Sequence, residues 1–312
     1  MLADLLVLLL GLALIVFGAD YLVEGASRIA RKAGVSQFVI GLTIVGMGTS
    51  APEFVVSMIG AFKGSADIAI GNVLGSNIFN TLLILGVTAF ILPIAITKNN
   101  FRRDLPVNLG VTLLFLVLGF FDGLSRIDGA ILLACFALYI WYCFRFDEHT
   151  AEEEEDTSTG KLAVNILLVL GGLAALVFGG RFFVNSATAL AYRMGASEKF
   201  VAVTILAGGT SLPELATCVV AAVKKKGALA LGNIIGSNLF NILLILGCSA
   251  VITPLSFAHI KWVDAGVLTA SALLLMTAAF TGKNNKIDRL DGGILLAVWV
   301  GYLAWLIVNI SV

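Results

Sequence analysis

One stretch of this sequence occurs twice, in the same internal order. The segment "GTSAPEF" at residues 48–54 returns as "GTSLPEL" at residues 209–215. The segment "GNVLGSNIFNTLLILG" at residues 71–86 returns as "GNIIGSNLFNILLILG" at residues 232–247, at the same offset of 161 residues. Because the two motifs keep their spacing across a variable segment, chance similarity is a poor explanation and an internal duplication is indicated.

The duplication defines the organisation of the whole chain. Residues 41–86 and 202–247 share 22 identities in 46 positions without a gap. The segments before them also align, "VFGADYLV" with "VFGGRFFV". We therefore expect two homologous halves, residues 1–146 and residues 162–312, joined by an acidic linker at residues 147–161.

The composition indicates a membrane protein. Hydrophobic residues make up 59% of the chain and charged residues 13%, and the mean hydropathy is +1.01. Apolar runs recur at about the 20 residues that a helix needs to cross a bilayer. The fold predicted is therefore all-α and polytopic, with ten transmembrane helices in two five-helix halves. The expected helices lie near residues 4–26, 35–62, 68–92, 105–121, 127–146, 162–188, 200–223, 228–252, 262–281 and 290–310.

An odd number of helices in each half makes the second half enter the membrane from the opposite side, which the charges support. Arg28, Arg31 and Lys32 follow the first helix, whereas its counterpart is followed by Arg193 alone. Conversely, Lys63 corresponds to a run of three lysines at 224–226. Assigned to sides in this way, fourteen Lys and Arg residues lie on one side and five on the other, and Arg181 is the exception because it lies inside the expected helix at 162–188. Since cytoplasmic loops collect Lys and Arg, we expect an inverted repeat in a cell (inner) membrane, with both termini outside the cytoplasm.

The first motif predicts a broken helix that carries an acid in each half. Pro52 and Pro213 each remove a backbone N–H and disfavour a continuous helix, so the helices at 35–62 and 200–223 should break. In lipid, irregular backbone is tolerated only where it is buried in protein or lines a wet cavity. Glu53 and Glu214 follow these prolines without a basic residue nearby in sequence. We expect a transported cation to compensate them, helped by the freed carbonyls and by the hydroxyls of Thr49, Ser50, Thr210 and Ser211.

The second motif adds further oxygen donors. Ser76 and Asn80 are four residues apart, as are Ser237 and Asn241, so each pair shares one face of its helix. Gly71, Gly75, Gly232 and Gly236 should allow close helix approach there. For Asn72, Asn77, Asn233 and Asn238, bonding between helices is an equally good interpretation.

The expected donors suit a hard cation. Carboxylate, carbonyl, hydroxyl and amide oxygens without Cys or His favour calcium or sodium over zinc, copper or iron. Two carboxylates carry a charge of −2, which one calcium ion, two sodium ions or two protons would neutralise. A third sodium ion would make the exchange electrogenic. Inverted repeats with interrupted helices are typical of secondary transporters that bind their substrate near the midplane.

The paired "GTSAPE" and "GTSLPE", followed by "GSNIFN" and "GSNLFN", resemble the alpha-repeats of the calcium/cation antiporter superfamily, in its prokaryotic sodium/calcium exchanger branch. The resemblance implies that four helices, at 35–62, 68–92, 200–223 and 228–252, bind the ions. The helices at 4–26 and 162–188 would slide across them to switch access. It also implies that calcium leaves the cytoplasm in exchange for external sodium.

Carried over by position, the resemblance implies a calcium site, two flanking sodium positions and a middle position. These would involve, in that order, Glu53, Glu214, Thr49 and Thr210; Ser76 and Ser237 with the carbonyls of Gly46 and Ala207; and Asn80 and Asn241. Many relatives have aspartate at one of the last two places, and here both are Asn. Proton-driven members carry a glutamate where this chain has Gly75 and Gly236. Sodium is therefore the expected driving ion, and calcium/proton antiport is the alternative.

Other classes fit the sequence less well. A channel needs an open conduction path, whereas two inverted halves around one site favour alternating access. An intramembrane hydrolase needs a nucleophile with a base or a metal pair, and neither HExxH nor GxSxG occurs. A transporter of organic solutes would need aromatic or basic groups at the broken helices. The prediction is thus a transporter and not an enzyme, without a cofactor or a nucleic-acid partner.

Overall fold

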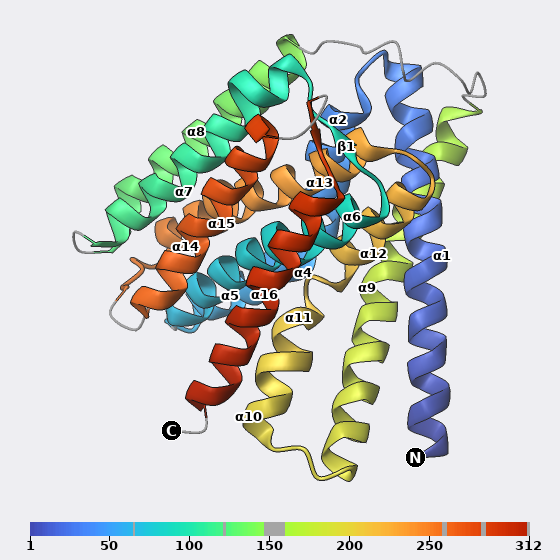
Figure 1. The fold of residues 1–312 in the computed structure, drawn as a ribbon, viewed down its shortest axis with the longest axis vertical. Coiled ribbons are helices and arrows are strands. Elements are labelled where there is room, and N and C mark those ends of the chain that lie inside the picture. Colours follow the sequence, from blue (N-terminus) through green and yellow to red (C-terminus); the bar gives the residue numbers. More distant parts are fainter. Residues whose placement is uncertain (65, 121–122, 147–159, 258–260, 282–284, 311–312) are drawn as a thin grey trace.

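The computed structural model describes residues 1–64, 66–120, 123–146, 160–257, 261–281 and 285–310. The described part is almost entirely helical (Figure 1). The predicted acidic linker at 147–161 lies outside the described residues except for Gly160 and Lys161. The boundaries of the two halves therefore remain a prediction.

Each half contains long helices and helices assembled from several pieces, where η denotes a π-helical segment. The first half contains α1 (Leu2–Ala33), α2 (Gln37–Ile40), η1 (Gly41–Val45), α3 (Gly46–Thr49), α4 (Ala51–Phe62), α5 (Ala66–Ile78), η2 (Phe79–Ile84), α6 (Leu85–Ile91), β1 (Ile94–Ala95), η3 (Asn100–Asp104), α7 (Leu105–Phe120) and α8 (Arg126–Arg145). The second contains α9 (Leu162–Arg193), α10 (Glu198–Val201), η5 (Ala202–Leu206), α11 (Ala207–Gly209), α12 (Leu212–Val223), α13 (Gly227–Leu239), η6 (Phe240–Ile245), α14 (Leu246–Ile252), α15 (Trp262–Thr281), β2 (Lys286–Ile287) and α16 (Arg289–Ile310). The helical stretches agree with the ranges expected from the sequence, although α1 and α9 extend further.

The number of membrane crossings is defined less sharply than the helices themselves. Among the described residues, eight helical stretches are long and apolar enough to cross a membrane. Gln37–Thr49 and Ala51–Phe62 make a ninth if this pair, bent by 50°, is one span, and Leu212–Val223 is a shorter apolar helix. The all-α membrane fold is confirmed, and the count of ten crossings stays a prediction.

The breaks fall at the two repeated prolines, as expected. Pro52 and Pro213 lie in the first turns of α4 and α12, where a missing N–H costs little. Ser50 and Ser211 are the N-cap residues of these two helices, and their backbone lies outside the helical region, with ψ of 9° in both halves. The two broken helices therefore have the same local geometry, and each starts a new helix inside the protein.

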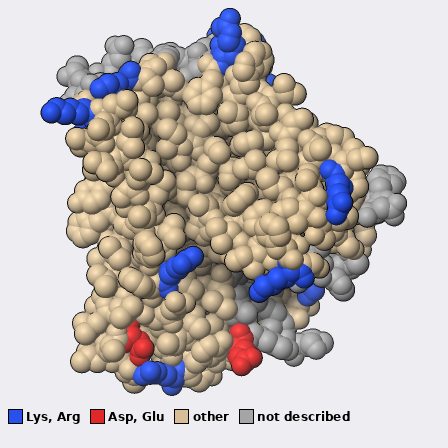
Figure 2. Space-filling view, turned by 180° about the vertical axis from the view of Figure 1, so that it is seen from behind, with Lys and Arg blue, Asp and Glu red and all other residues tan. Residues whose placement is uncertain are grey.

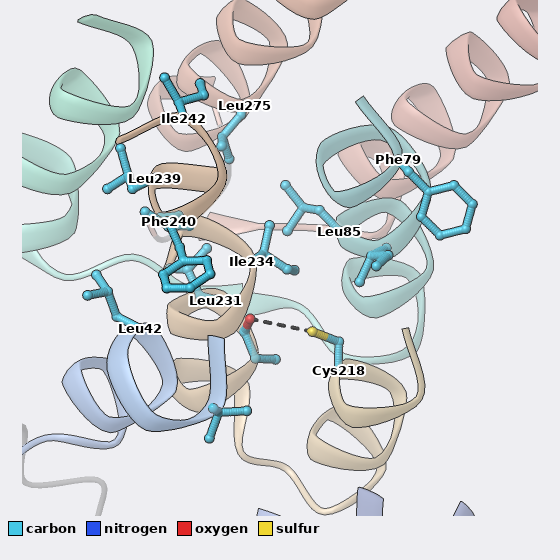
Figure 3. Close-up of a cluster of buried hydrophobic side chains, with 14 of the residues drawn as sticks. Leu42, Phe79, Leu85, Cys218, Leu231, Ile234, Leu239, Phe240, Ile242 and Leu275 are labelled. Carbon is cyan, nitrogen blue, oxygen red and sulfur yellow. Dashed lines mark hydrogen bonds between the residues drawn. The ribbon is translucent and has the colours of Figure 1, made fainter. Parts of the chain in front are cut away.

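The centre of the fold consists of the two helices that carry the second motif. In their most apolar windows, 72% of Ile68–Ile91 and 83% of Gly227–Ile252 is buried, against at most 39% in the other six long helices. Figure 3 shows side chains of α13 and η6 packed against Leu42 of η1, Cys218 of α12 and Leu85 of α6. Residues of both halves thus share one core.

The outer surface is suited to lipid. Large hydrophobic side chains are exposed along the peripheral helices, including Phe17, Phe120 and Phe280. On the face in Figure 2, charged side chains are few and are separated by broad uncharged areas. Such a surface would make a water-soluble protein aggregate, whereas hydrocarbon chains solvate it. The chain is an integral membrane protein.

A short β-ladder, which the sequence did not predict, connects the halves. β1 pairs antiparallel with β2, with Ile94 opposite Ile287 and Ala95 opposite Lys286. A second isolated bridge joins Leu124 to Leu255. Two-residue strands lack the length that gives a recognisable alternation in sequence.

The two longest helices, α1 and α9, run antiparallel in direct backbone contact (Figure 1). A Cβ at Gly11 would lie 2.8 Å from the Gly179 carbonyl, and one at Gly172 would lie 2.7 Å from the Gly18 carbonyl. These glycines recur every seven residues along each helix, which keeps them on the shared face. The first helices of the two halves therefore point in opposite directions, as an inverted repeat requires.

This packing predicts different outcomes for two adjacent glycines. Gly172→Ala should lower the stability of the folded protein by about 1–3 kcal/mol, because the added methyl group meets backbone atoms of α1. Gly171→Ala should cause no loss, because no described atom lies within 4 Å of its added Cβ and alanine favours a helix. Thermal unfolding in detergent compares the two variants, and an equal loss of stability would contradict the close contact.

Candidate cation site

The two glutamates of the repeated motif lie buried at the breaks. Glu53 and Glu214 occupy the first turns of α4 and α12, and each is only 1% exposed. The free N–H groups at a helix start favour negative charge, which explains in part how a carboxylate is tolerated there. Among the described residues no ion pair joins either carboxylate to a Lys or Arg.

The serines of the first motif form hydrogen bonds to the glutamates of the opposite half. The Ser50 hydroxyl donates a hydrogen bond to Glu214 Oε1 at 2.8 Å, and the Ser211 hydroxyl donates to Glu53 Oε1 at 3.0 Å. Each half therefore orients the carboxylate of the other half. The sequence placed these four residues in one site, although the crossed pairing was not foreseen.

Within the described part of the chain, four oxygen atoms of the two repeated motifs have no hydrogen-bond partner. They are the second carboxylate oxygens of the two glutamates and the amide oxygens of two asparagines, namely Glu53 Oε2, Glu214 Oε2, Asn80 Oδ1 and Asn241 Oδ1. All four are buried, and an unsatisfied buried acceptor is costly. The set is symmetric about the repeat, and carboxylate and amide oxygens are donors that a hard cation accepts.

The orientation of the two asparagines is set by a second crossed contact. Asn80 Nδ2 donates to Asn238 Oδ1 at 3.2 Å, and Asn241 Nδ2 donates to Asn77 Oδ1 at 2.9 Å. With both amide nitrogens directed at the opposite half, the amide oxygens keep their lone pairs free. Asn77 and Asn238 thus bond helices together, in agreement with the alternative interpretation of the sequence.

The remaining hydroxyls contact Glu53, the Gly46 carbonyl and Asn233. Ser76 Oγ lies 3.5 Å from Glu53 Oε1, and Ser237 Oγ lies 3.4 Å from the Gly46 carbonyl. The Thr49 hydroxyl donates to Asn233 Oδ1 at 3.2 Å and lies 3.4 Å from the same Gly46 carbonyl. The structure thus places Ser76 beside Glu53 and Ser237 beside the Gly46 carbonyl, and the sodium positions stay a prediction.

The second half is less enclosed at its break. Thr210 caps α11 and lies close to Glu53, but it is only partly buried. It also lines a cavity of about 340 Å³ together with Pro52 and Pro213. Ala207 is the first residue of α11, so its carbonyl belongs to the same broken segment. The cluster thus borders open space on the side of Thr210.

Sequence reasoning missed the π-helical segments. η1 and η5 lie 161 residues apart, as do η2 and η6, so both pairs follow the repeat. Asn80 and Asn241 lie in η2 and η6. Single-turn π-helical segments concentrate at functional sites because they redirect side chains and carbonyls. No residue type announces them, since they depend on packing rather than on local propensity.

Several known proteins are similar to this chain over nearly its whole length. The family model "Sodium/calcium exchanger protein" matches residues 4–145 and 164–308. A putative antiporter, CaxA, of Alkalimonas amylolytica is 40% identical, with 97% of this chain and 98% of that protein covered. The sodium/calcium exchanger MaX1 of Methanosarcina acetivorans is 34% identical, with 96% and 97% covered.

A solved structure has the same architecture. The sodium-calcium exchanger NCX_Mj, in crystals soaked with zero Na⁺ and Ca²⁺, superimposes with a TM-score of 0.84 at 34% identity. The alignment covers 97% of this chain and 98% of that one. Sequence family, fold and a symmetric cluster of buried oxygens therefore agree, and the chain belongs to the sodium/calcium exchanger family of membrane antiporters.

Proposed function

We propose that this protein exports cytoplasmic calcium in exchange for external sodium by alternating access. The observation that carries the proposal is the set of four unpartnered buried oxygens on Glu53, Glu214, Asn80 and Asn241. They belong to both halves, so an ion bound among them would lie where the two inverted repeats meet. The similarity of this chain to MaX1 and NCX_Mj, both sodium/calcium exchangers, supports the same pair of ions.

The donor chemistry supports calcium as one substrate. Calcium takes six to eight oxygen ligands in flexible geometry, and it accepts carboxylate, carbonyl and amide oxygens alike. Here Glu53 and Glu214 supply the charge, and the hydroxyls of Thr49 and Thr210 lie beside them. Ser50 and Ser211 hold the carboxylates in place. In this arrangement Asn80 and Asn241 border a middle position.

Sodium would occupy flanking positions. Ser76 lies next to Glu53, and Ser237 lies next to the Gly46 carbonyl. The Ala207 carbonyl is the repeat counterpart of that of Gly46. Two sodium ions balance the two carboxylates, and a third makes the transport cycle electrogenic. Each net charge moved is then worth about 2.3 kcal/mol for every 100 mV of membrane potential.

The distribution of basic residues supports the expected orientation. In the cell (inner) membrane, the face rich in Lys and Arg would lie in the cytoplasm and both termini outside it. Export against the calcium gradient then draws on the inward gradient of sodium. If protons replace sodium, the same two glutamates are the residues able to carry them.

The glutamates are the first residues to test. Glu53→Gln or Glu214→Gln should weaken calcium binding about 10–100-fold and abolish calcium flux, because one ligand charge is lost from a buried site. Glu198→Gln is the matched control, since it removes an exposed carboxylate at the start of α10. Calcium titration of thermal stability and uptake into proteoliposomes provide the readouts. Full transport by either variant of the motif would refute the site.

The asparagines make a separate prediction. Asn241→Asp should shift the ion preference towards calcium relative to sodium without eliminating transport, because a third carboxylate raises the ligand charge. Asn309→Asp, an exposed change near the end of α16, serves as the control. Competition between sodium and calcium in uptake measures the effect, and an unchanged ratio would remove Asn241 from the site.

The coupling ion follows from one experiment. Proteoliposomes loaded in turn with sodium, potassium, choline or acid buffer should take up calcium only with an outward sodium gradient when the membrane potential is clamped. Uptake should also respond to the clamped voltage. Uptake that follows the proton gradient alone would instead establish calcium/proton antiport.

A further inference from the structure

The two ends of this molecule differ in packing and in ion pairs, although they derive from the same duplicated sequence. Lys224 caps α12 at one end, here called the Lys224 face, and its repeat counterpart Lys63 caps α4 at the other, the Lys63 face. The helix that could cover each end is also duplicated. It is α1 at the Lys224 face and α9 at the Lys63 face.

At the Lys224 face, acids of α1 bind lysines that follow α12. Lys224 Nζ lies 2.7 Å from Asp20 Oδ1 and 3.7 Å from Glu24 Oε2. Lys226 Nζ lies 3.5 Å from the same Glu24 Oε2, while Arg28 pairs with its other oxygen at 2.9 Å. The side chains of these ion pairs are between 17% and 45% exposed. Because Glu24 takes part in several of the pairs, they form one connected network rather than an isolated surface pair.

At the Lys63 face, the duplication has not kept these acids. Arg181 and Asn185 of α9 take the places of Asp20 and Glu24. In place of ion pairs, these two side chains line the cavity of about 340 Å³ that also borders Pro52 and Pro213. A positive charge on α9 cannot attract Lys63, and among the described residues this kind of ionic attachment is found at the Lys224 face alone.

The backbone packing shows the same difference. A Cβ at Gly232 of α13 would clash with the carbonyl oxygen of Phe38, and one at Gly236 would clash with that of Leu42. Their counterparts Gly71 and Gly75 have open space among the described residues. Gly75 lines a second cavity of about 680 Å³. The Lys224 face is therefore packed shut, whereas the Lys63 face is hollow.

The helix α12 connects this ionic network to the cation site. Glu214 lies in its first turn and Lys224 at its C-cap, so one twelve-residue helix, about 18 Å long, carries both. Any displacement of α12 relative to α1 would alter the ion pair between Lys224 and Asp20 and would move Glu214 at the same time. The network thus acts on the position of a predicted ion ligand without touching the ion.

In an inverted repeat, the state open to the opposite side results when the two halves exchange their conformations. The Lys63 face would then close, and α1 would part from α12. We infer that Asp20 and Glu24 are positioning residues that hold the transporter closed at the Lys224 face through Lys224 and Lys226. This inference rests on the proposed alternating access, because a protein with one conformation would have no equilibrium to bias.

The test measures the open face directly. Val56 lines the 340 Å³ cavity, so Val56→Cys reports access from the Lys63 face to a water-soluble maleimide, with the parent and its four native cysteines as background. In lipid nanodiscs without calcium or sodium, Lys224→Asp should slow the labelling about two- to fivefold, the range that ion pairs of this exposure contribute. The neighbouring change Lys225→Asp is the matched control, since no ion pair of Lys225 is described and its side chain is exposed.

The swap Asp20→Lys with Lys224→Asp should restore the labelling rate, which loss of folding alone would not do. As a second variant, Arg181→Asp should slow labelling as well, because it gives α9 the acid that could attract Lys63 when that face closes. Labelling unchanged in both Lys224→Asp and Arg181→Asp, or a swap that restores nothing, would overturn the inference.

Calcium uptake by the same variants separates the two levels of proposal. If the parent takes up no calcium, the proposed function fails while the labelling rates still decide the role of the ion pairs. If uptake is intact and the labelling rates do not move, the positioning role fails and the proposed function stands.

Discussion

The burial of two carboxylates is the constraint on which the rest of this structure depends. Removing two negative charges from water is costly unless hydrogen bonds and cations replace the lost hydration. The helix breaks provide free N–H groups, the serines provide hydroxyl donors, and no Lys or Arg in the described part of the chain neutralises the pair. A fixed basic residue would neutralise the two carboxylates permanently, and the site would then have no charge left with which to bind transported cations. The charge is left for mobile ions to balance.

Because of the inverted duplication, each of the central hydrogen bonds occurs twice, once from each half. Ser50 and Ser211 cross between halves, and so do the amides of Asn80 and Asn241. The contacts are nearly symmetric at the centre and become different towards the two faces. This pattern is what a transporter needs, because the site must bind the same ions from both sides while only one side is open.

The sequence was sufficient to predict the helices, their breaks and the residues that gather at the centre. Proline at 52 and 213 and the acid that follows each proline are local signals whose meaning in lipid is nearly unambiguous. The crossed partners were not predictable in the same way. Ser50 could have bonded Glu53 of its own half, and the choice depends on how the halves dock.

The asymmetry lay further out of reach of sequence reasoning. Gly71 and Gly75 were expected to pack as closely as Gly232 and Gly236, and that expectation was wrong for the first pair in this conformation. Because the two copies of each motif are nearly identical, their sequence does not indicate which face of the protein is closed in a given conformation. Asp20 and Arg181, by contrast, differ in the sequence itself, and their significance becomes visible only when Lys224 is seen beside one of them.

The crossed hydrogen bonds of Ser50 and Ser211 make each half of the chain depend on the other. Because Ser50 serves Glu214 and Ser211 serves Glu53, neither half contains a complete set of contacts for its own carboxylate. A half-length ancestor could have formed the site only as an antiparallel pair of copies. All four residues lie in described segments of the two halves, so two separate half-chains would together hold both of these hydrogen-bonded pairs, and neither half would hold one alone.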